Sequence, residues 1–250
     1  MQPYLYTLLV ALGTVTSLGF IFRQGYPRYL KKVHRPRVFR RHITEAVLLI
    51  VFCIVMGARA GYVWLHWNRY ASELRRVLQL WEGGLVFHGG LAGAMLGLLL
   101  YRSLRNVPVR HVLDMAVPYV CIGYAIGRIG CFLNGCCAGR VTDLPWGVAF
   151  PDLLGSQLRH PTQLYASGAA VGIFVLLAAI YTRSRFPGTT TGAFFVLFGT
   201  YRFLMEFLRL HMPVDGGLSP FQWTALVMTA VGIALVITPK KYVQPYRKGG

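Results

Sequence analysis

The chain has 250 residues, of which 55% are hydrophobic and only 14% are charged, and its mean hydropathy is +0.49. Soluble domains carry about 25% charged residues, so this composition excludes an ordinary soluble protein as well as a disordered one. The 26 Lys and Arg against 8 Asp and Glu give a formal charge of +18, which in a soluble chain would suggest nucleic-acid binding. Because apolar runs dominate the chain, we interpret the basic residues as a membrane-orientation signal and expect no nucleic-acid partner.

Apolar runs of near-spanning length follow one another along the chain. Seven are found, at 4–22, 43–65, 85–101, 112–127, 163–182, 190–208 and 221–239. A hydrocarbon core about 30 Å thick needs about 20 helical residues, so the third and fourth runs require tilt or a deep position in the bundle. The first run lacks the basic start and the cleavage site of a signal peptide. The sequence therefore predicts an all-α polytopic membrane protein with about seven transmembrane helices, forming one domain over 1–250.

The distribution of basic residues predicts the orientation of these helices. Seventeen of the 26 Lys and Arg residues fall in alternate connecting segments, namely 23–42, 102–111, 183–189 and 240–250. The positive-inside rule then places the N-terminus outside and the C-terminus in the cytoplasm. The longest outer segment, 128–162, is expected to cap the helix bundle.

Glycines recur at four-residue spacing within two of the runs. Gly89, Gly93 and Gly97 lie in the third run, and Gly123 and Gly127 in the fourth. Such spacing allows helix backbones to approach closely in lipid, so we expect these glycines to serve packing.

The sixth run carries three ionisable residues on one helical face, Arg202, Glu206 and Arg209. Charges inside a membrane are costly and usually face an interior or a functional cavity. A structural ion pair is one interpretation, but two arginines against one carboxylate leave a surplus of positive charge. A guanidinium presents a fork of donors that matches phosphate, so the surplus indicates an anion site.

Other unusual polar residues fall at the same predicted level, near the outer ends of the helices. They are Tyr6, Arg59, Glu82, His88, Arg128, Arg159, His160, Gln163, Tyr165 and Gln222. The inner halves of the runs look nearly free of such groups. We therefore expect a polar cavity toward the outer leaflet.

Three of the five cysteines, Cys131, Cys136 and Cys137, cluster in the outer segment. They could bind a metal or an iron–sulfur centre, form a disulfide on an oxidising side of the membrane, or simply pack as small residues. The cluster lacks the paired C-x2-C spacing of zinc sites, so we expect no required metal and no cofactor. Cys53 and Cys121 lie in apolar runs and are expected to be inert.

Five motifs in this order resemble the prolipoprotein diacylglyceryl transferase family nearly end to end. They are WEGGLVFHGG at 81–90, GRIGCFLNGCCAGR at 127–140, RHPTQLY at 159–165, YRFLMEFLR at 201–209 and LSPFQ at 218–222. The resemblance implies transfer of the diacylglyceryl group of phosphatidylglycerol to the lipobox cysteine thiol of preprolipoprotein signal peptides, with release of glycerol phosphate. It also implies a multi-pass protein of the bacterial cytoplasmic (inner) membrane, with its active site toward the outer leaflet.

The resemblance also implies roles for individual residues. Arg128 and Arg202 match essential arginines that would hold the phosphate, and His88 matches a histidine that is a candidate base for the thiol. Substrate-binding positions would be Tyr6, Arg59, Glu82, Asn134, Gly139, His160, Gln163, Tyr165, Glu206, Arg209 and Gln222. The family often has Asn and Glu where this chain has Cys131 and Cys136, so a carboxylate at this loop has no role here.

Three other functions stay open at this point. A lipid-binding member of the family without transferase activity would share every motif. A small anion transporter would also need intramembrane arginines, but it would line both halves of the bundle with polar residues. A membrane redox or metal protein would use the cysteine cluster.

Overall fold

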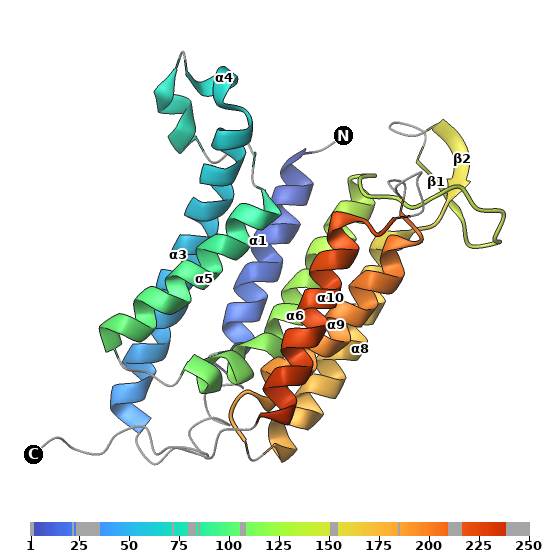
Figure 1. The fold of residues 1–250 in the computed structure, drawn as a ribbon. Helices are drawn as coiled ribbons and strands as arrows, with labels where there is room; N and C mark the ends of the chain where they lie inside the picture. The colour runs from blue at the N-terminus through green and yellow to red at the C-terminus, as the bar shows by residue number, and fades with distance from the viewer. Residues whose placement is uncertain are drawn as a thin grey trace, which may run out of the picture. The chain divides into compact units, whose positions relative to one another are not determined.

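The computed structural model describes residues 3–21, 23, 36–71, 73–79, 84, 86–105, 109–150, 155–184, 186–209 and 217–238. Within these ranges, side chains are not described for 3–7, 10, 11, 36–43, 87, 88 and 105. The chain separates into two compact units, which Figure 1 shows as a ribbon. The first unit holds α1 (Pro3–Phe20), α6 (Val109–Leu133), β1 (Val148–Phe150), β2 (Gly155–Arg159), α8 (Thr162–Arg183), α9 (Thr189–Glu206) and α10 (Pro220–Ile237). The second holds α3 (Pro36–Leu65), α4 (Trp67–Tyr70), the 3-10 helix η2 (Leu74–Leu78) and α5 (Phe87–Arg105). The predicted single-domain organisation stays a prediction.

The predicted helical character is confirmed, since each of the seven apolar runs coincides with a long helix. Four of the described helices are long and apolar enough to cross a membrane: Thr44–Leu65 within α3, α6, α8 and α10. A shorter apolar helix, Gly89–Leu104, lies within α5. The length and apolar character of these helices therefore identify a multi-pass membrane protein. The number of seven spans and their orientation stay predictions.

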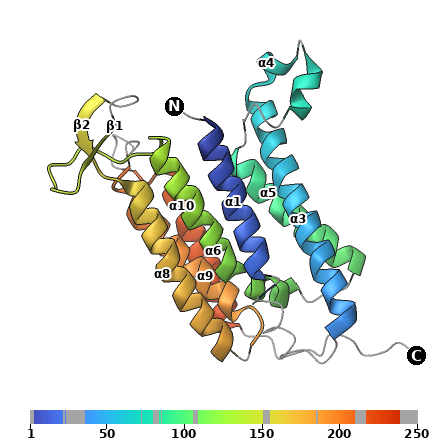
Figure 2. The ribbon, with the colours of Figure 1, turned by 180° about the vertical axis from the view of Figure 1, so that it is seen from behind.

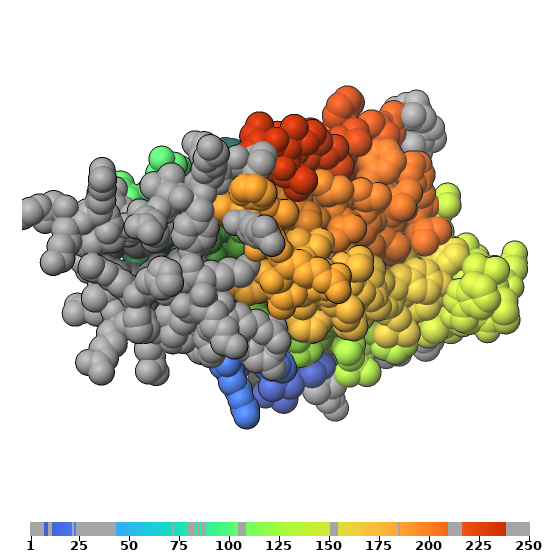
Figure 3. All heavy atoms as spheres, turned by 90° about the horizontal axis from the view of Figure 1, so that it is seen from below, coloured from blue at the N-terminus to red at the C-terminus, as the bar shows by residue number. Residues whose placement is uncertain are grey.

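The outer surfaces of these helices are apolar. Leu48 and Phe52 of α3 are 63% and 62% exposed, and Val175 of α8 and Val227 of α10 are 58% and 60% exposed. Figure 3 shows the side chains of α8, α9 and α10 as one continuous surface of the first unit. Uncovered apolar area on this scale is unfavourable in water and suits contact with lipid chains.

A two-stranded hairpin departs from the all-α prediction. β1 and β2 pair antiparallel, with Val148 opposite Arg159 and Ala149 opposite Leu158, and the register shifts at Phe150. The strands are 3 and 5 residues long, too short to show a clear two-residue period in the sequence. The hairpin lies within the segment that was expected to cap the bundle.

Glycine packing is confirmed in the second unit and only partly in the first. A Cβ on Gly93 of α5 would collide with the carbonyl oxygen of Cys53 in α3, so only glycine permits this approach. In the first unit, Gly123 of α6 packs against Gly13 of α1 in the same way. The packing role predicted for Gly127 is not found among the described residues, where a Cβ at this position would meet nothing within 4 Å.

A buried carboxylate fixes where α9 begins. Asp114 of α6 accepts hydrogen bonds from the backbone N–H of Gly188 at 2.6 Å and of Thr191 at 2.7 Å, and from the Thr191 hydroxyl at 2.6 Å. Negative charge at a helix N-terminus satisfies its unpaired N–H groups and opposes the helix dipole. The inner halves of the runs were expected to be nearly free of unusual polar residues, and Asp114 is an exception that serves the fold.

The helices of the first unit alternate in direction, which brings four helix ends together. α6 and α9 end where α8 and α10 begin, and the hairpin lies at this same end (Figures 1 and 2). Residues late in α6 and α9 therefore meet residues early in α8 and α10. The motifs of the sequence fall at these positions.

Candidate active site at one end of the first unit

An ion pair and a helix cap join α9 to α10. Arg202 Nη1 lies 2.8 Å from Glu206 Oε2 as a close ion pair rather than an aligned hydrogen bond. The Ser219 hydroxyl donates to Glu206 Oε1 at 3.2 Å, and Ser219 and Gln222 form a reciprocal capping box at the start of α10. Glu206 is only 1% exposed, so its charge depends on these partners. Arg202 is thereby held with its guanidinium over the ring of Phe221, 5.1 Å from its centroid.

Arg128, in the last turns of α6, has a different environment. Its guanidinium lies over the ring of Tyr124, 4.9 Å from the centroid, and the two residues are one helical turn apart. Tyr201 of α9 lies within electrostatic range of Tyr124, Arg128 and Arg202. Among the described residues, no carboxylate forms an ion pair with Arg128.

Arg209 completes a group of three guanidiniums. Burial lowers its pKa, and the positive charges of Arg202 and Arg128 lower it further, so both of these arginines lie within electrostatic range of Arg209. Glu206 is the one described carboxylate that pairs with this group. Three guanidiniums and one carboxylate leave a surplus of positive charge, as the sequence predicted for span six.

The loop after α6 is tied to the start of α8. Gln163 Nε2 donates to the carbonyl oxygen of Cys136 at 2.6 Å, and the Thr162 hydroxyl donates to that of Cys137 at 2.7 Å. The neighbouring thiols of Cys131 and Cys136, with the charges of Arg128 and Arg209, lower the pKa of Cys137. The cysteine cluster thus borders the arginine group.

Gly139 brings the segment after α9 against the segment before α8. It forms a β-bridge with Arg209, and its N–H donates to the carbonyl of His160 at 2.9 Å. A Cβ at Gly139 would stand 2.6 Å from the carbonyl oxygen of Leu208 and 2.8 Å from the His160 Cβ, so no other residue fits. Gly139 therefore shapes the site through its backbone.

His160 and Tyr165 form a polar contact at the base of the hairpin. His160 Nδ1 lies 3.4 Å from the Tyr165 hydroxyl, which also accepts a hydrogen bond from Trp146 Nε1 at 2.8 Å. Both predicted residues thus lie at the same end of the unit as the arginines.

Several buried polar atoms at this end have no hydrogen-bond partner among the described residues. They are Asn134 Oδ1, Arg159 Nε, Gln163 Oε1, Arg209 Nε and Gln222 Nε2. Buried polar groups in folded proteins are paired in the great majority of cases, and the exceptions gather at sites that bind water or a ligand. This end of the first unit therefore offers unpaired hydrogen-bond donors and acceptors in addition to its surplus of positive charge.

The structure brings together most of the predicted residues, and the others fall elsewhere. Arg128, Asn134, Gly139, His160, Gln163, Tyr165, Arg202, Glu206, Arg209 and Gln222 share one end of the first unit. Glu82 lies outside the described residues, and the side chains of Tyr6 and His88 lie outside the described side chains.

Arg59 belongs to the second unit and donates hydrogen bonds to backbone carbonyls of its own chain. It is 3% exposed, and it donates to the carbonyl oxygens of Val77 at 2.9 Å, Arg76 at 2.5 Å, Gln79 at 3.2 Å and Gly84 at 3.4 Å. These contacts hold the segment after α4 against α3, and the predicted contact of Arg59 with a substrate stays a prediction.

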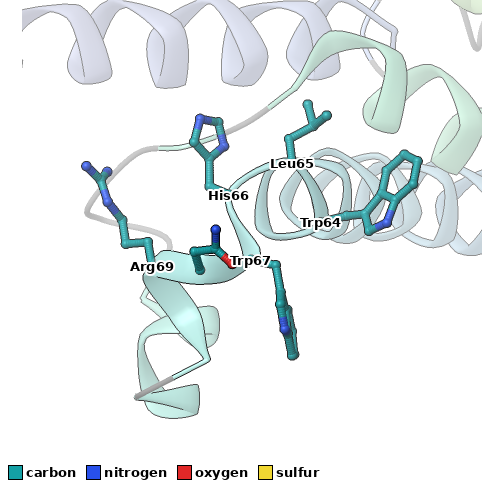
Figure 4. Close-up of a pocket in the computed structure, with 6 residues that line it drawn as sticks. Trp64, Leu65, His66, Trp67 and Arg69 are labelled. Carbon is teal, nitrogen blue, oxygen red and sulfur yellow. The ribbon is translucent and has the colours of Figure 1, made fainter.

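An open pocket of about 430 Å³ lies at the turn between α3 and α4, in the second unit. Figure 4 shows Trp64 and Trp67 projecting from this turn in different directions, with His66 and Arg69 beside them. Exposed tryptophans with a nearby cation are typical of the level where lipid headgroups meet water. None of the residues predicted for the site lines this pocket.

Sequence reasoning missed two aromatic residues of the site, Tyr124 and Tyr201. A signal for Tyr124 was present, because a tyrosine four residues before Arg128 lies on the same helical face. Tyr201 directly precedes Arg202, but its approach to Arg128 depends on how α9 packs against α6, which the sequence does not show.

Comparison with known proteins agrees with the motifs. The family described as prolipoprotein diacylglyceryl transferase matches residues 1–238. A phosphatidylglycerol–prolipoprotein diacylglyceryl transferase of Cupriavidus necator is 34% identical over an alignment of 236 residues that covers 90% of this chain and 86% of the relative. Enzymes of the same name from Cupriavidus pinatubonensis and Bordetella avium are 36% and 35% identical, each covering 90% of this chain and 85% and 88% of the relative.

The match spans all the helices described above and includes the end where the arginines gather. Identity of this level over nearly the full length of both proteins establishes common descent. The chain belongs to the prolipoprotein diacylglyceryl transferase family.

Proposed function

We propose that this protein transfers the diacylglyceryl group of phosphatidylglycerol to the lipobox cysteine thiol of preprolipoproteins and releases glycerol phosphate. Family membership supports the reaction, and the observation that carries it is the surplus of guanidinium groups at one end of the first unit. An enzyme that binds a lipid phosphate and stabilises its departure needs positive charge that the fold has not already neutralised.

The reaction makes one bond and breaks another. The cysteine sulfur attacks the glyceryl carbon, a C–S bond forms, and the C–O bond to the phosphate breaks. Glycerol phosphate leaves with the electron pair of that bond, and the thiol proton passes to a base. Negative charge on the phosphate oxygens grows during this step, and donors placed around it lower the barrier.

The arginines are assigned to that phosphate. Arg128 and Arg202 would bind its oxygens, and Glu206 would orient Arg202 through their 2.8 Å ion pair. Arg209 would add to the positive potential, since its Nε has no partner among the described residues. His88 is the proposed base, and the positive field of the arginines is the alternative way to favour a thiolate.

The other predicted residues would bind and shape the substrates. Gln163, Gln222 and Asn134 each keep one buried polar atom unpaired among the described residues, and these atoms are proposed contacts for the glycerol headgroup or the peptide backbone. His160 and Tyr165 would border the peptide through the hairpin, and Gly139 would act through its backbone. Tyr6, Arg59 and Glu82 are proposed as further contacts on the basis of their motif positions alone.

We further propose seven membrane spans in the bacterial inner membrane, with the N-terminus and the active site outside. The basic residues of the segments 23–42, 102–111, 183–189 and 240–250 support this orientation. Single cysteines introduced at Arg23 and Arg140, both exposed, test it in a background in which the five native cysteines are replaced by serine. A membrane-impermeant thiol reagent should label position 140 and spare position 23 in intact cells, and labelling of both or neither would contradict the topology.

Transfer itself is tested with purified protein in vesicles of labelled phosphatidylglycerol and a peptide that carries a lipobox cysteine. We expect label on the peptide, glycerol phosphate in solution, and no loss of rate with a metal chelator. A folded protein that binds the lipid and transfers nothing would identify a family member without transferase activity. A peptide whose cysteine is replaced by serine is the matched control, because its hydroxyl is a much weaker nucleophile at neutral pH.

A further inference from the structure

Three thiols gather at the end of α6 and in the loop that follows it. The Sγ atoms of Cys131, Cys136 and Cys137 all lie within 4.8 Å of one another, and all three cysteines are free. Two sulfurs bound to one tetrahedral zinc ion stand about 3.8 Å apart, given Zn–S bonds of about 2.3 Å. A contraction of about 1 Å or less would therefore place all three sulfurs around one ion.

We propose that Cys131, Cys136 and Cys137 form a three-thiolate site for a soft or borderline metal cation, of which zinc and cadmium are the representatives. The site is separate from the transfer reaction, for which no metal is expected. Thiolate ligands select such cations over magnesium and calcium, which prefer oxygen.

The backbone of this loop is already held in place. The Cys136 carbonyl accepts from Gln163 Nε2, and the Cys137 carbonyl accepts from the Thr162 hydroxyl. Cys137 has a φ of 65°, a left-handed conformation that a non-glycine residue adopts at some cost. Because the main chain is fixed by α8, binding would need only small side-chain rotations, which keeps the entropic cost low.

The surrounding charge suits a metal–thiolate complex. Binding of a divalent cation to three thiolates releases three protons to solvent and leaves one net negative charge. Arg128 and Arg209 lie within electrostatic range of Cys137 and offset that charge. Cys137 is exposed, so an ion has a route to the sulfurs and a water molecule can take the fourth ligand position.

The sequence spacing had argued against a metal here, because C-x4-C-C does not match a C-x2-C pair. The fold removes that objection. Gly135, with a φ of 71°, turns the chain directly after α6, and the Cys136 thiol then donates to the carbonyl of Cys131 at 3.6 Å. A tight turn thus brings sulfurs together that the linear spacing separates.

Cadmium titration of the purified full chain tests the proposal. The protein is first reduced with a thiol-free phosphine and its five free thiols are counted, so that a disulfide does not mask the ligands. We expect one Cd²⁺ per chain, with the ultraviolet charge-transfer band of three cadmium–thiolate bonds, and displacement by Zn²⁺.

Serine variants identify the ligands. We expect the band to fall by about a third in each of the variants Cys131→Ser, Cys136→Ser and Cys137→Ser. Replacing a residue that only supports a metal ligand typically weakens metal binding by about 10- to 100-fold, and replacing a ligand itself should weaken cadmium binding by more than this. Cys53→Ser and Cys121→Ser are the matched controls, and they should change neither the band nor the affinity for cadmium. Absence of the band in the reduced protein, or an unchanged band in the three-serine variant, would overturn the proposal. These readouts do not use lipid transfer, so the site and the proposed activity can fail separately.

Discussion

Two kinds of arginine lie within the apolar helices of this protein, and their partners distinguish them. Arg59 of α3 is 3% exposed and donates to four backbone carbonyls of the segment that follows α4. Arg128 of α6 is half-buried and lies on the ring of Tyr124, with no carboxylate among its described partners. Arg202 is intermediate, since Glu206 holds one side of its guanidinium and Phe221 lies beneath it.

The difference separates the structural role of Arg59 from the binding role that is proposed for Arg128. Donors that already bind backbone carbonyls stabilise the fold, and removal of the arginine leaves buried acceptors without partners. Donors that the fold leaves free are available to a ligand, and a positive charge without a counter-ion favours an anion. Membrane arginines therefore need not all mark the same site, although they look alike in the sequence.

The largest expected effect is on transfer when an arginine of the proposed phosphate site is removed. Arg128→Ala and Arg202→Ala should each lower the rate of diacylglyceryl transfer by about 10²–10³-fold, as the loss of a donor to developing charge does in other enzymes. Arg→Lys at either position should restore only part of the rate, because an ammonium replaces the charge but not the planar fork.

The measurement is initial rate per folded protein, with folding checked by circular dichroism and thermal melting. Normal rates in a well-folded alanine variant would remove the phosphate assignment. Poor expression with a normal specific rate would instead give these arginines the structural role that Arg59 has.

His88→Ala sharpens the comparison by asking whether the arginine field alone activates the thiol. We expect a loss of about 10²-fold or more near neutral pH, which is typical of a missing general base. A free thiol has a pKa of about 8.5, so raising the pH above this value forms thiolate without help and should recover much of the rate. A deficit that stays constant from pH 7 to pH 9.5 would contradict a proton-accepting role.

Arg59→Ala should act on stability instead. Each buried carbonyl that loses its donor costs about 1–3 kcal/mol, so the variant should melt at a clearly lower temperature than Arg128→Ala. Thermal unfolding of both variants in the same detergent measures the contrast. Equal melting temperatures would show that the carbonyl contacts of Arg59 do not stabilise the second unit.

Glu206→Gln should produce the smallest change. The amide oxygen can still accept from Ser219, whose hydroxyl lies 3.2 Å from Glu206 Oε1, so the start of α10 should remain intact. Arg202 loses its counter-ion but keeps its guanidinium, and we expect transfer to fall by about tenfold, or about 1.4 kcal/mol. A fall as large as that of Arg202→Ala, measured in the same assay, would mean that Glu206 contacts the reacting groups itself.

The sequence predicted the helices well because each is a run of apolar residues bounded by charge, and that pattern is local. It also predicted that Arg202, Glu206 and Arg209 would share a helical face, which is wrong for Arg209. α9 ends at Glu206, and Arg209 lies beyond it in a β-bridge with Gly139, so the spacing rule applies to Arg202 and Glu206 alone. That most of the site residues would lie at one end of the helices was predicted from the alternating direction of successive helices.

The features that the sequence did not reveal depend on contacts between distant segments. Asp114 caps α9 across 74 residues of chain, and nothing in the local pattern of α6 marks it as a cap. The structural role of Arg59 depends on carbonyls 17 to 25 residues away, which no side-chain pattern encodes. Likewise, the three thiols meet because of a turn at Gly135, although their C-x4-C-C spacing lacks a C-x2-C pair.

Binding of phosphatidylglycerol tests the central claim most directly, because it measures the phosphate contact without the chemistry. The affinity of labelled phosphatidylglycerol is measured for the purified protein and for Arg128→Ala and Arg59→Ala in micelles of a neutral detergent. A charge-assisted hydrogen bond is worth about 1.5–3 kcal/mol, so Arg128→Ala should bind the lipid about 10- to 100-fold more weakly than the unmodified chain. An Arg128→Ala protein that is folded and binds phosphatidylglycerol as tightly as the unmodified chain would contradict the claim that the free guanidiniums hold the lipid phosphate.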